Sequence, residues 1–101
     1  MEKFLSGLFM FIISMILRID STHTGALMER GELKLDLKEY KEALEDFKKV
    51  IRIDAKHTNA HYKAGHAYYN IGDSDGACME WKIARDLGFV DGFNMIESNC
   101  K

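Results

Sequence analysis

The chain of 101 residues contains no proline and only two cysteines. Because proline is the residue that most strongly interrupts helices, its absence favours an all-helical chain. Two cysteines are too few for a disulfide scaffold, and their spacing is not that of a zinc-binding knuckle. The net charge is only -2, and no basic stripe with interleaved aromatic residues occurs. The sequence therefore predicts no nucleic-acid partner.

Motifs of common catalytic sites are also missing. The sequence has no glycine-rich phosphate loop, no G-x-S-x-G and no constellation of paired carboxylates. His57 and His61 are four residues apart, a spacing that can hold a metal ion on one helical face, but no third ligand joins them. We predict that the protein is not an enzyme and has no catalytic residues, no metal site and no cofactor.

What the sequence does contain is a repeat. Residues 17–24 read LRIDSTHT, and residues 51–58, at an offset of 34 positions, read IRIDAKHT. The same offset relates three further pairs: Gly31 and Gly65, Ala43 and Ala77, Phe47 and Trp81. A fixed period of this size is typical of a solenoid in which each unit is one supersecondary element.

Hydrophobic periodicity indicates that this unit is a helical hairpin. Apolar residues between 40 and 51 recur at alternating spacings of three and four, which is one stripe of an α-helix. A weaker helix is predicted over 25–37. In the second unit, helices are predicted over 59–71 and 74–87, with Asp73 or Ser74 as the N-cap.

The repeat resembles the tetratricopeptide repeat, whose pattern is W-x2-L-G-x2-Y, then A-x3-F, then P. The second unit supplies His61, Ala64, Gly65, Tyr68, Ala77 and Trp81 at the first six of these positions. The first unit matches at Gly31, Ala43 and Phe47 but has Leu27, Arg30, Lys34 and Ala55 at the tryptophan, leucine, tyrosine and proline positions. Arg30 therefore stands where a buried residue is usual, and its charge must reach solvent or find a partner.

The resemblance implies an all-α, right-handed solenoid of helical hairpins, similar to small bacterial members of the family. We expect a single domain with an apolar N-terminal helix over 1–23, two full repeats over 24–57 and 58–91, and a capping helix over 92–101. The cap would place Phe93, Met95 and Ile96 on its packed side.

The resemblance further implies a non-catalytic module that binds a peptide or a partner helix in a concave groove lined by the first helix of each hairpin. The implied contact residues are Asn59, Tyr62, His66 and Tyr69 in the second repeat and Met28, Glu32 and Leu35 in the first. Tyrosine and histidine suit recognition because each offers flat apolar area together with a hydrogen-bonding group. The alternative is that part of this face packs on the N-terminal helix.

The strongly apolar N-terminal segment has two interpretations. It could be the second helix of a truncated repeat, with a core of Phe9, Met10, Ile13, Ile16 and Leu17. It could instead be a secretory signal or anchor, with Lys3 before an apolar run over 4–17. Outward apolar residues, namely Leu8, Phe11, Ile12 and Met15, predict self-association or membrane contact through residues 4–17. An alternative function is thus an exported or membrane-associated assembly factor anchored by residues 1–17, whereas the location that the sequence favours is cytoplasmic.

The two cysteines, Cys78 and Cys100, lie at similar distances before and after the predicted turn at 88–91. Antiparallel helices on either side of that turn would bring them together. They are either two small buried apolar residues or a disulfide that fastens the capping helix, and a disulfide would require an oxidising compartment.

Overall fold

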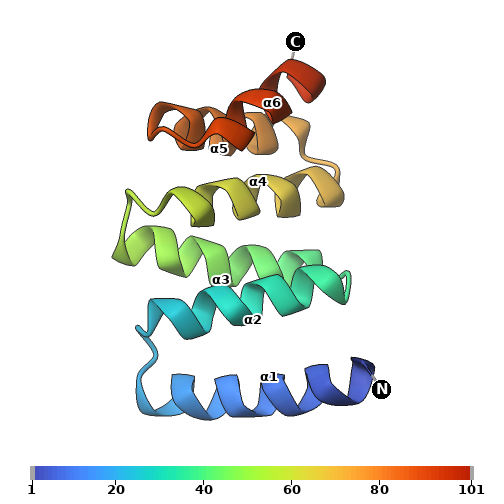
Figure 1. Ribbon diagram of the computed structural model, residues 1–101, viewed down its shortest axis with the longest axis vertical. Helices are drawn as coiled ribbons and strands as arrows, with labels where there is room; N and C mark the ends of the chain where they lie inside the picture. The colour runs from blue at the N-terminus through green and yellow to red at the C-terminus, as the bar shows by residue number, and fades with distance from the viewer. Residues whose placement is uncertain (1, 101) are drawn as a thin grey trace.

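The computed structural model describes residues 2–100, with side chains described for residues 7–91 and 94–100. These residues form six helices and no strand. The helices are α1 (Glu2–Ile19), α2 (Thr24–Asp36), α3 (Tyr40–Ile53), α4 (Thr58–Ile71), α5 (Ser74–Asp86) and α6 (Val90–Asn99). Each helix packs on the next along the chain, so that the molecule is a stack with α1 at one end and α6 at the other (Figure 1). The predicted all-α solenoid of helical hairpins is confirmed.

Side-chain caps explain why the sequence repeats around residues 17–24 and 51–58. The Nδ1 atoms of His23 and His57 accept hydrogen bonds from the backbone N–H groups of Ala26 and Ala60, at 3.0 and 3.1 Å. Each histidine thereby satisfies one of the free backbone donors at the start of the first helix of a hairpin. Asp73, one of the two predicted caps, performs the same role for α5.

The two hairpins are held by close contacts between a glycine and an aromatic ring. A Cβ atom on Gly31 would lie 2.5 Å from the ring of Phe47, and one on Gly65 would collide with the indole of Trp81. Both aromatic side chains are fully buried. Only glycine lets the paired helices approach this closely, because any larger residue would push the ring out of the core.

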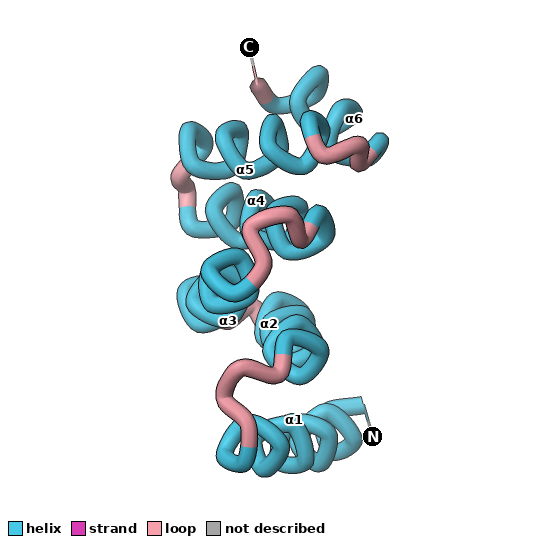
Figure 2. The backbone as a smooth tube through the Cα atoms, turned by 90° about the vertical axis from the view of Figure 1, so that its left-hand side faces the viewer, coloured by secondary structure: helices cyan, strands magenta, loops and turns pink. Residues whose placement is uncertain are grey.

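Helix α1 packs on the stack along one side only. Ile13 and Leu17 are buried as predicted, and Met10 is half-buried. The prediction that Phe9 and Ile16 belong to the core is wrong, because both are exposed. Among the described residues only α2 packs extensively on α1, whereas α3 lies between α2 and α4 (Figure 2). The opposite side of α1 is therefore left open.

At the C-terminal end, α6 starts two residues before the predicted capping helix and packs on α5. Met95 and Ile96 are half-buried there, as predicted, while the side chain of Phe93 lies outside the described residues. The cap covers the end of the stack that contains Trp81.

The turn between α2 and α3 contains a strained residue. Lys38 has a φ of 64°, in the left-handed region, and Gly72 has a φ of 98° at the same position of the second repeat. Both turns close with the same backbone hydrogen bonds, from residues 38 and 72 to the carbonyl groups of Leu35 and Tyr69. Glycine adopts this conformation without steric cost, whereas lysine does not.

Replacing Trp81 by alanine should lower the free energy of unfolding by about 3–5 kcal/mol, because the substitution leaves a large cavity next to Gly65. Met79, an exposed residue of the same helix, is the matched control. Met79→Ala should change stability by less than about 0.5 kcal/mol. Urea unfolding of the two variants measures both values, and a loss below about 1 kcal/mol for Trp81→Ala would mean that the indole does not fill the core.

Lys38→Gly should raise the free energy of unfolding by about 0.5–1 kcal/mol, because it removes the strain of a side chain at positive φ. The reverse change at the equivalent turn, Gly72→Ala, should lower stability by about 1 kcal/mol. Thermal and urea melts provide the comparison. If Lys38→Gly is less stable than the native chain, the left-handed conformation is not the one that this turn adopts.

Candidate functional site

Helix α4 carries the predicted contact residues of the second repeat at spacings of three, four and three, which keeps them on one helical face. Asn59 and Tyr69 are exposed, whereas Tyr62 and His66 are half-buried. The face is thus open at both ends of α4 and partly covered in the middle, where α5 and the start of α6 lie against it.

Aromatic contacts order this face. The ring of Tyr62 meets the edge of His66 at a centroid distance of 4.6 Å and that of Phe89 at 4.7 Å. His66 and Tyr69 in turn lie 5.6 and 5.9 Å from the indole of Trp81. We call these five residues the aromatic cluster. All but the Tyr69–Trp81 pair are edge-to-face, an arrangement that stabilises the cluster beyond the burial of apolar area.

The environment of the cluster favours the neutral forms of His66 and Tyr62. Burial, with a smaller contribution from Lys63, lowers the pKa of His66 below its ordinary value of 6.5. Burial, assisted by the negative charge of Asp91, raises the pKa of Tyr62 above 10.0. Near neutral pH the face therefore offers an uncharged imidazole and a phenol, both of which can hydrogen-bond.

The first repeat contributes less to this face than the sequence predicts. Met28 is buried and Leu35 packs against the hydrophobic core. A buried Met28 cannot contact a partner, so we no longer count it among the contact residues. The reason is that α2 lies between α1 and α3 and uses these side chains for packing. Glu32 remains half-exposed in a shallow pocket beside Phe9 of α1.

Next to this face, the buried His61 forms a polar network that the sequence analysis did not predict. His61 stands at the tryptophan position of the family pattern, and its Nδ1 lies 2.6 Å from Glu80 Oε2. Its Nε2 lies 2.8 Å from the carbonyl oxygen of Ala55. Each ring nitrogen of His61 thus faces an oxygen atom that can accept a hydrogen bond. A histidine at a position that normally holds tryptophan was the available signal for a buried polar pair.

Arg30 finds its partner in Asp46. Its Nε and Nη2 donate to the two carboxylate oxygens at 2.9 and 2.7 Å, and Lys34 Nζ lies 3.7 Å from the same carboxylate. The hydrogen bond to Asp46 raises the pKa of Arg30. The sequence predicts that Arg30 needs a partner but not which one, because Asp46 comes from the other helix of the hairpin.

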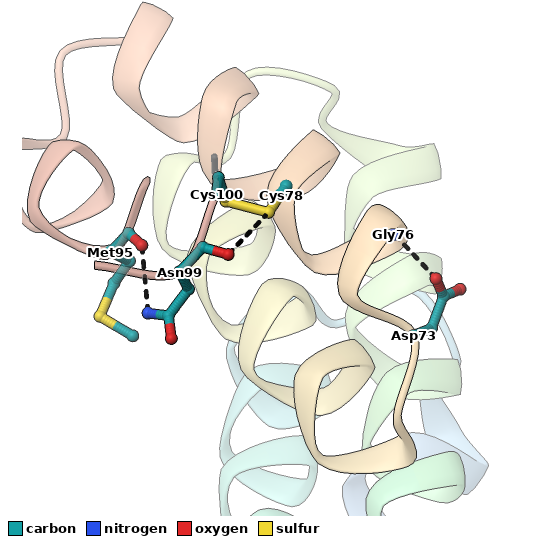
Figure 3. The surroundings of a disulfide bond; sticks show 6 residues. All are labelled: Asp73, Gly76, Cys78, Met95, Asn99 and Cys100. Carbon is teal, nitrogen blue, oxygen red and sulfur yellow. Dashed lines mark hydrogen bonds between the residues drawn. A yellow bond between two sulfur atoms is a disulfide. The ribbon is translucent and has the colours of Figure 1, made fainter. Parts of the chain in front are cut away.

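The two cysteines are joined. Cys78 of α5 forms a disulfide with Cys100 at the end of α6, closing a loop of 22 residues (Figure 3). Of the two alternatives left open by the sequence, the structure contains the disulfide. It fastens the C-terminal end of α6 to α5, and the preceding turn presents Phe89 to Tyr62. The disulfide therefore supports the part of the stack that carries the aromatic cluster.

No cluster of three or more metal-ligating side chains occurs among the residues that the structure describes. The two histidines with helical spacing have other partners, since His57 caps α4 and His61 bonds Glu80.

Residues 26–72 match the family model of the TPR repeat. They cover α2 except for its first two residues, together with α3 and α4. Taken with the stacked hairpins and the period of the sequence, this match decides the family. Residues 26–72 of the chain carry tetratricopeptide (TPR) repeats.

A curated relative of this TPR protein is considerably longer. It is 27% identical over 94 residues to the anaphase-promoting complex subunit 3 of Schizosaccharomyces pombe (strain 972 / ATCC 24843), and the match covers 88% of this chain but 14% of that protein. The chain thus spans about a seventh of the length of this curated relative.

Two solved structures share the fold. The crystal structure of MamA superposes with a TM-score of 0.81 at 23% identity, over 91% of this chain and 57% of that one. PcrH, crystallised with the chaperone binding region of PopD, superposes with a TM-score of 0.85 at 18% identity, over 96% of this chain and 82% of that one. Likeness at these identities establishes the arrangement of helices.

The lowered pKa of His66 makes part of the stability depend on pH. Because the unfolded chain binds the proton more readily, this contribution is present above about pH 6.5 and is lost as the pH falls below it. The native protein should therefore lose more unfolding free energy between about pH 7.5 and about pH 5.5 than His66→Phe, which keeps the ring but cannot titrate. Urea melts at the two pH values measure this, and equal losses would contradict the burial of His66.

Proposed function

We propose that this TPR protein is a non-catalytic interaction module that binds a peptide or a helix of another protein on the face of α4 that carries the aromatic cluster. The observation that carries the proposal is the exposure of Tyr69, 49% of whose surface is accessible although its ring lies against Trp81. An exposed aromatic ring over a rigid buried one offers a partner apolar area at a small cost in conformational entropy.

The chemistry of the surrounding groups supports a partner segment with apolar side chains and a few hydrogen-bonding groups. Asn59 offers an amide at the start of α4, and His66 offers an uncharged imidazole in the middle. Charges lie at the edges, with Lys63 close to His66 and Asp91 close to Tyr62. A largely neutral centre with charges at its rim is the usual composition of a protein-binding surface.

Comparison with a solved structure supports the same class of partner. PcrH has a similar fold and was crystallised with the chaperone binding region of PopD, which is a segment of another protein. TPR folds are typically interaction modules, and the role proposed for this chain needs no catalytic group. Glu32 is the residue of the first repeat that we keep in the proposed contact surface, because it is not taken up by the core.

A second candidate function is that of a membrane-associated or exported assembly factor attached through residues 1–17. The observation that favours it is the open apolar side of α1, on which Leu8, Phe11, Ile12 and Met15 are exposed. The side chains at the beginning of this segment, including Lys3 and Phe4, lie outside the described residues. None of the helices searched in the described part of the chain is long and apolar enough to cross a membrane.

Binding of a peptide selected from a random phage-displayed library tests the first proposal. Tyr69→Ala should weaken the affinity at least about tenfold, which is about 1.4 kcal/mol, because it removes the exposed ring. Asn59→Ala should weaken it less. Met79→Ala is the matched control because Met79 is also exposed, on α5, but lies outside the cluster, and the affinity of this variant should not change. Fluorescence anisotropy measures all three variants.

The proposed face would be wrong if Tyr69→Ala bound the selected peptide as tightly as the native protein while Met79→Ala did not. It would also be wrong if the tyrosine variant lost binding only in proportion to a loss of folded protein. Circular dichroism of each variant at the assay temperature separates this second outcome from a loss of contact.

A further inference from the structure

Helix α1 has the register of a second hairpin helix, but one of its sides lacks a partner. In α3, Ala43, Asp46 and Val50 are at most 2% exposed. The α1 residues that precede them by 34 positions, Phe9, Ile12 and Ile16, are 56%, 49% and 37% exposed. The difference arises because α3 packs between two helices, whereas α1 packs extensively only on α2.

The open side of α1 is also wider than a hairpin requires. Leu8, Phe11 and Met15 are 50%, 64% and 49% exposed. The corresponding positions in α3 are charged: Glu42, Glu45 and Lys49. Residues 7–17 contain no charged side chain. The described part of α1 thus presents a continuous apolar face, which we call the α1 face: Leu8, Phe9, Phe11, Ile12, Met15, Ile16 and Ile19.

We propose that the α1 face binds the α1 face of a second copy of this chain, forming a two-fold symmetric dimer. The area agrees with this partner. If a large side chain offers roughly 200 Å² when fully exposed, the exposed fractions of the seven residues correspond to about 800 Å² per chain. A stable standard-size interface buries about 800 Å² on each partner. A face without charges also meets its own copy without repulsion between like charges.

A further hairpin helix fits the α1 face poorly. In both complete repeats the second helix has alanine, Ala43 or Ala77, at a position that is fully buried in its hairpin. Phe9 occupies this position in α1. Its bulk prevents a helix from approaching as closely as α2 approaches α3, so that a partner must accommodate protruding rings.

A lipid surface also fits the α1 face less well than a second copy of the chain does. Helices that lie in a membrane interface carry several lysine or arginine residues beside their apolar face. The described side chains of α1 include a single cation, Arg18. A second α1 face supplies apolar area without needing such charges. The proposed dimer does not depend on the function assigned to the aromatic cluster, which belongs to other helices.

Sedimentation velocity of the full chain, over about 1–100 µM, tests the dimer. The native protein should sediment as a dimer, with dissociation only at the lowest concentrations. Phe11→Glu should raise the dissociation constant at least about tenfold, because it places a charge within the apolar contact. Met79→Glu, which puts the same charge at an equally exposed apolar residue of α5, should leave the dimer unchanged.

Three results would overturn the proposal. The first is a native protein that stays monomeric at about 100 µM, and the second is a Phe11→Glu variant that dimerises as the native protein does. The third is a monomer that co-sediments with vesicles of phosphatidylcholine and phosphatidylglycerol and loses this binding on Phe11→Glu, which would mean that the α1 face binds lipid. Phe11 is 64% exposed, so the monomer should remain folded in the variant, and circular dichroism verifies this.

Discussion

The contact between a glycine and an aromatic ring inside each hairpin is the constraint on which the rest of the structure depends. Gly31 against Phe47 and Gly65 against Trp81 determine how closely the two helices of each hairpin approach. That spacing buries both rings completely and leaves the next helix a flat surface to stack on. It also places the indole of Trp81 beneath His66 and Tyr69, so that the candidate binding face rests on the packing of the second hairpin.

Polar pairs replace apolar contacts at the positions where this chain departs from the family pattern. Arg30 and His61 replace a leucine and a tryptophan, and each is matched by a carboxylate from the partner helix of its own hairpin. The Arg30–Asp46 ion pair adds little net stability because its charges must be desolvated, but removing Arg30 would leave the buried Asp46 without two of its hydrogen bonds. The two pairs therefore specify which face of α2 meets α3 and which face of α4 meets α5.

Most of the fold follows from the periodicity of the sequence. The predicted helices of both hairpins agree with the structure to within a residue or so, because their apolar stripes and caps are local signals. The predictions about α1 and α2 were less accurate. The spacing of Phe9 and Ile16 predicts that they lie in the core, but both are exposed. The spacing of Met28 predicts that it lies on a binding surface, but it is buried. Whether such a residue is buried depends on how many neighbours its helix has, which no local pattern reveals.

The repeat, the helices and the need for a partner at Arg30 follow from the sequence alone, because period, caps and an unsatisfied charge are properties of short segments. The residue types of the α4 face could also be named in advance, since their spacing fits one side of a helix. Only the tertiary structure decided that Asp46 and Glu80 are the partners, that Cys78 bonds Cys100, and that His66 loses affinity for its proton. The physical reason is that hydrogen bonds, disulfides and desolvation act between groups brought together from different helices.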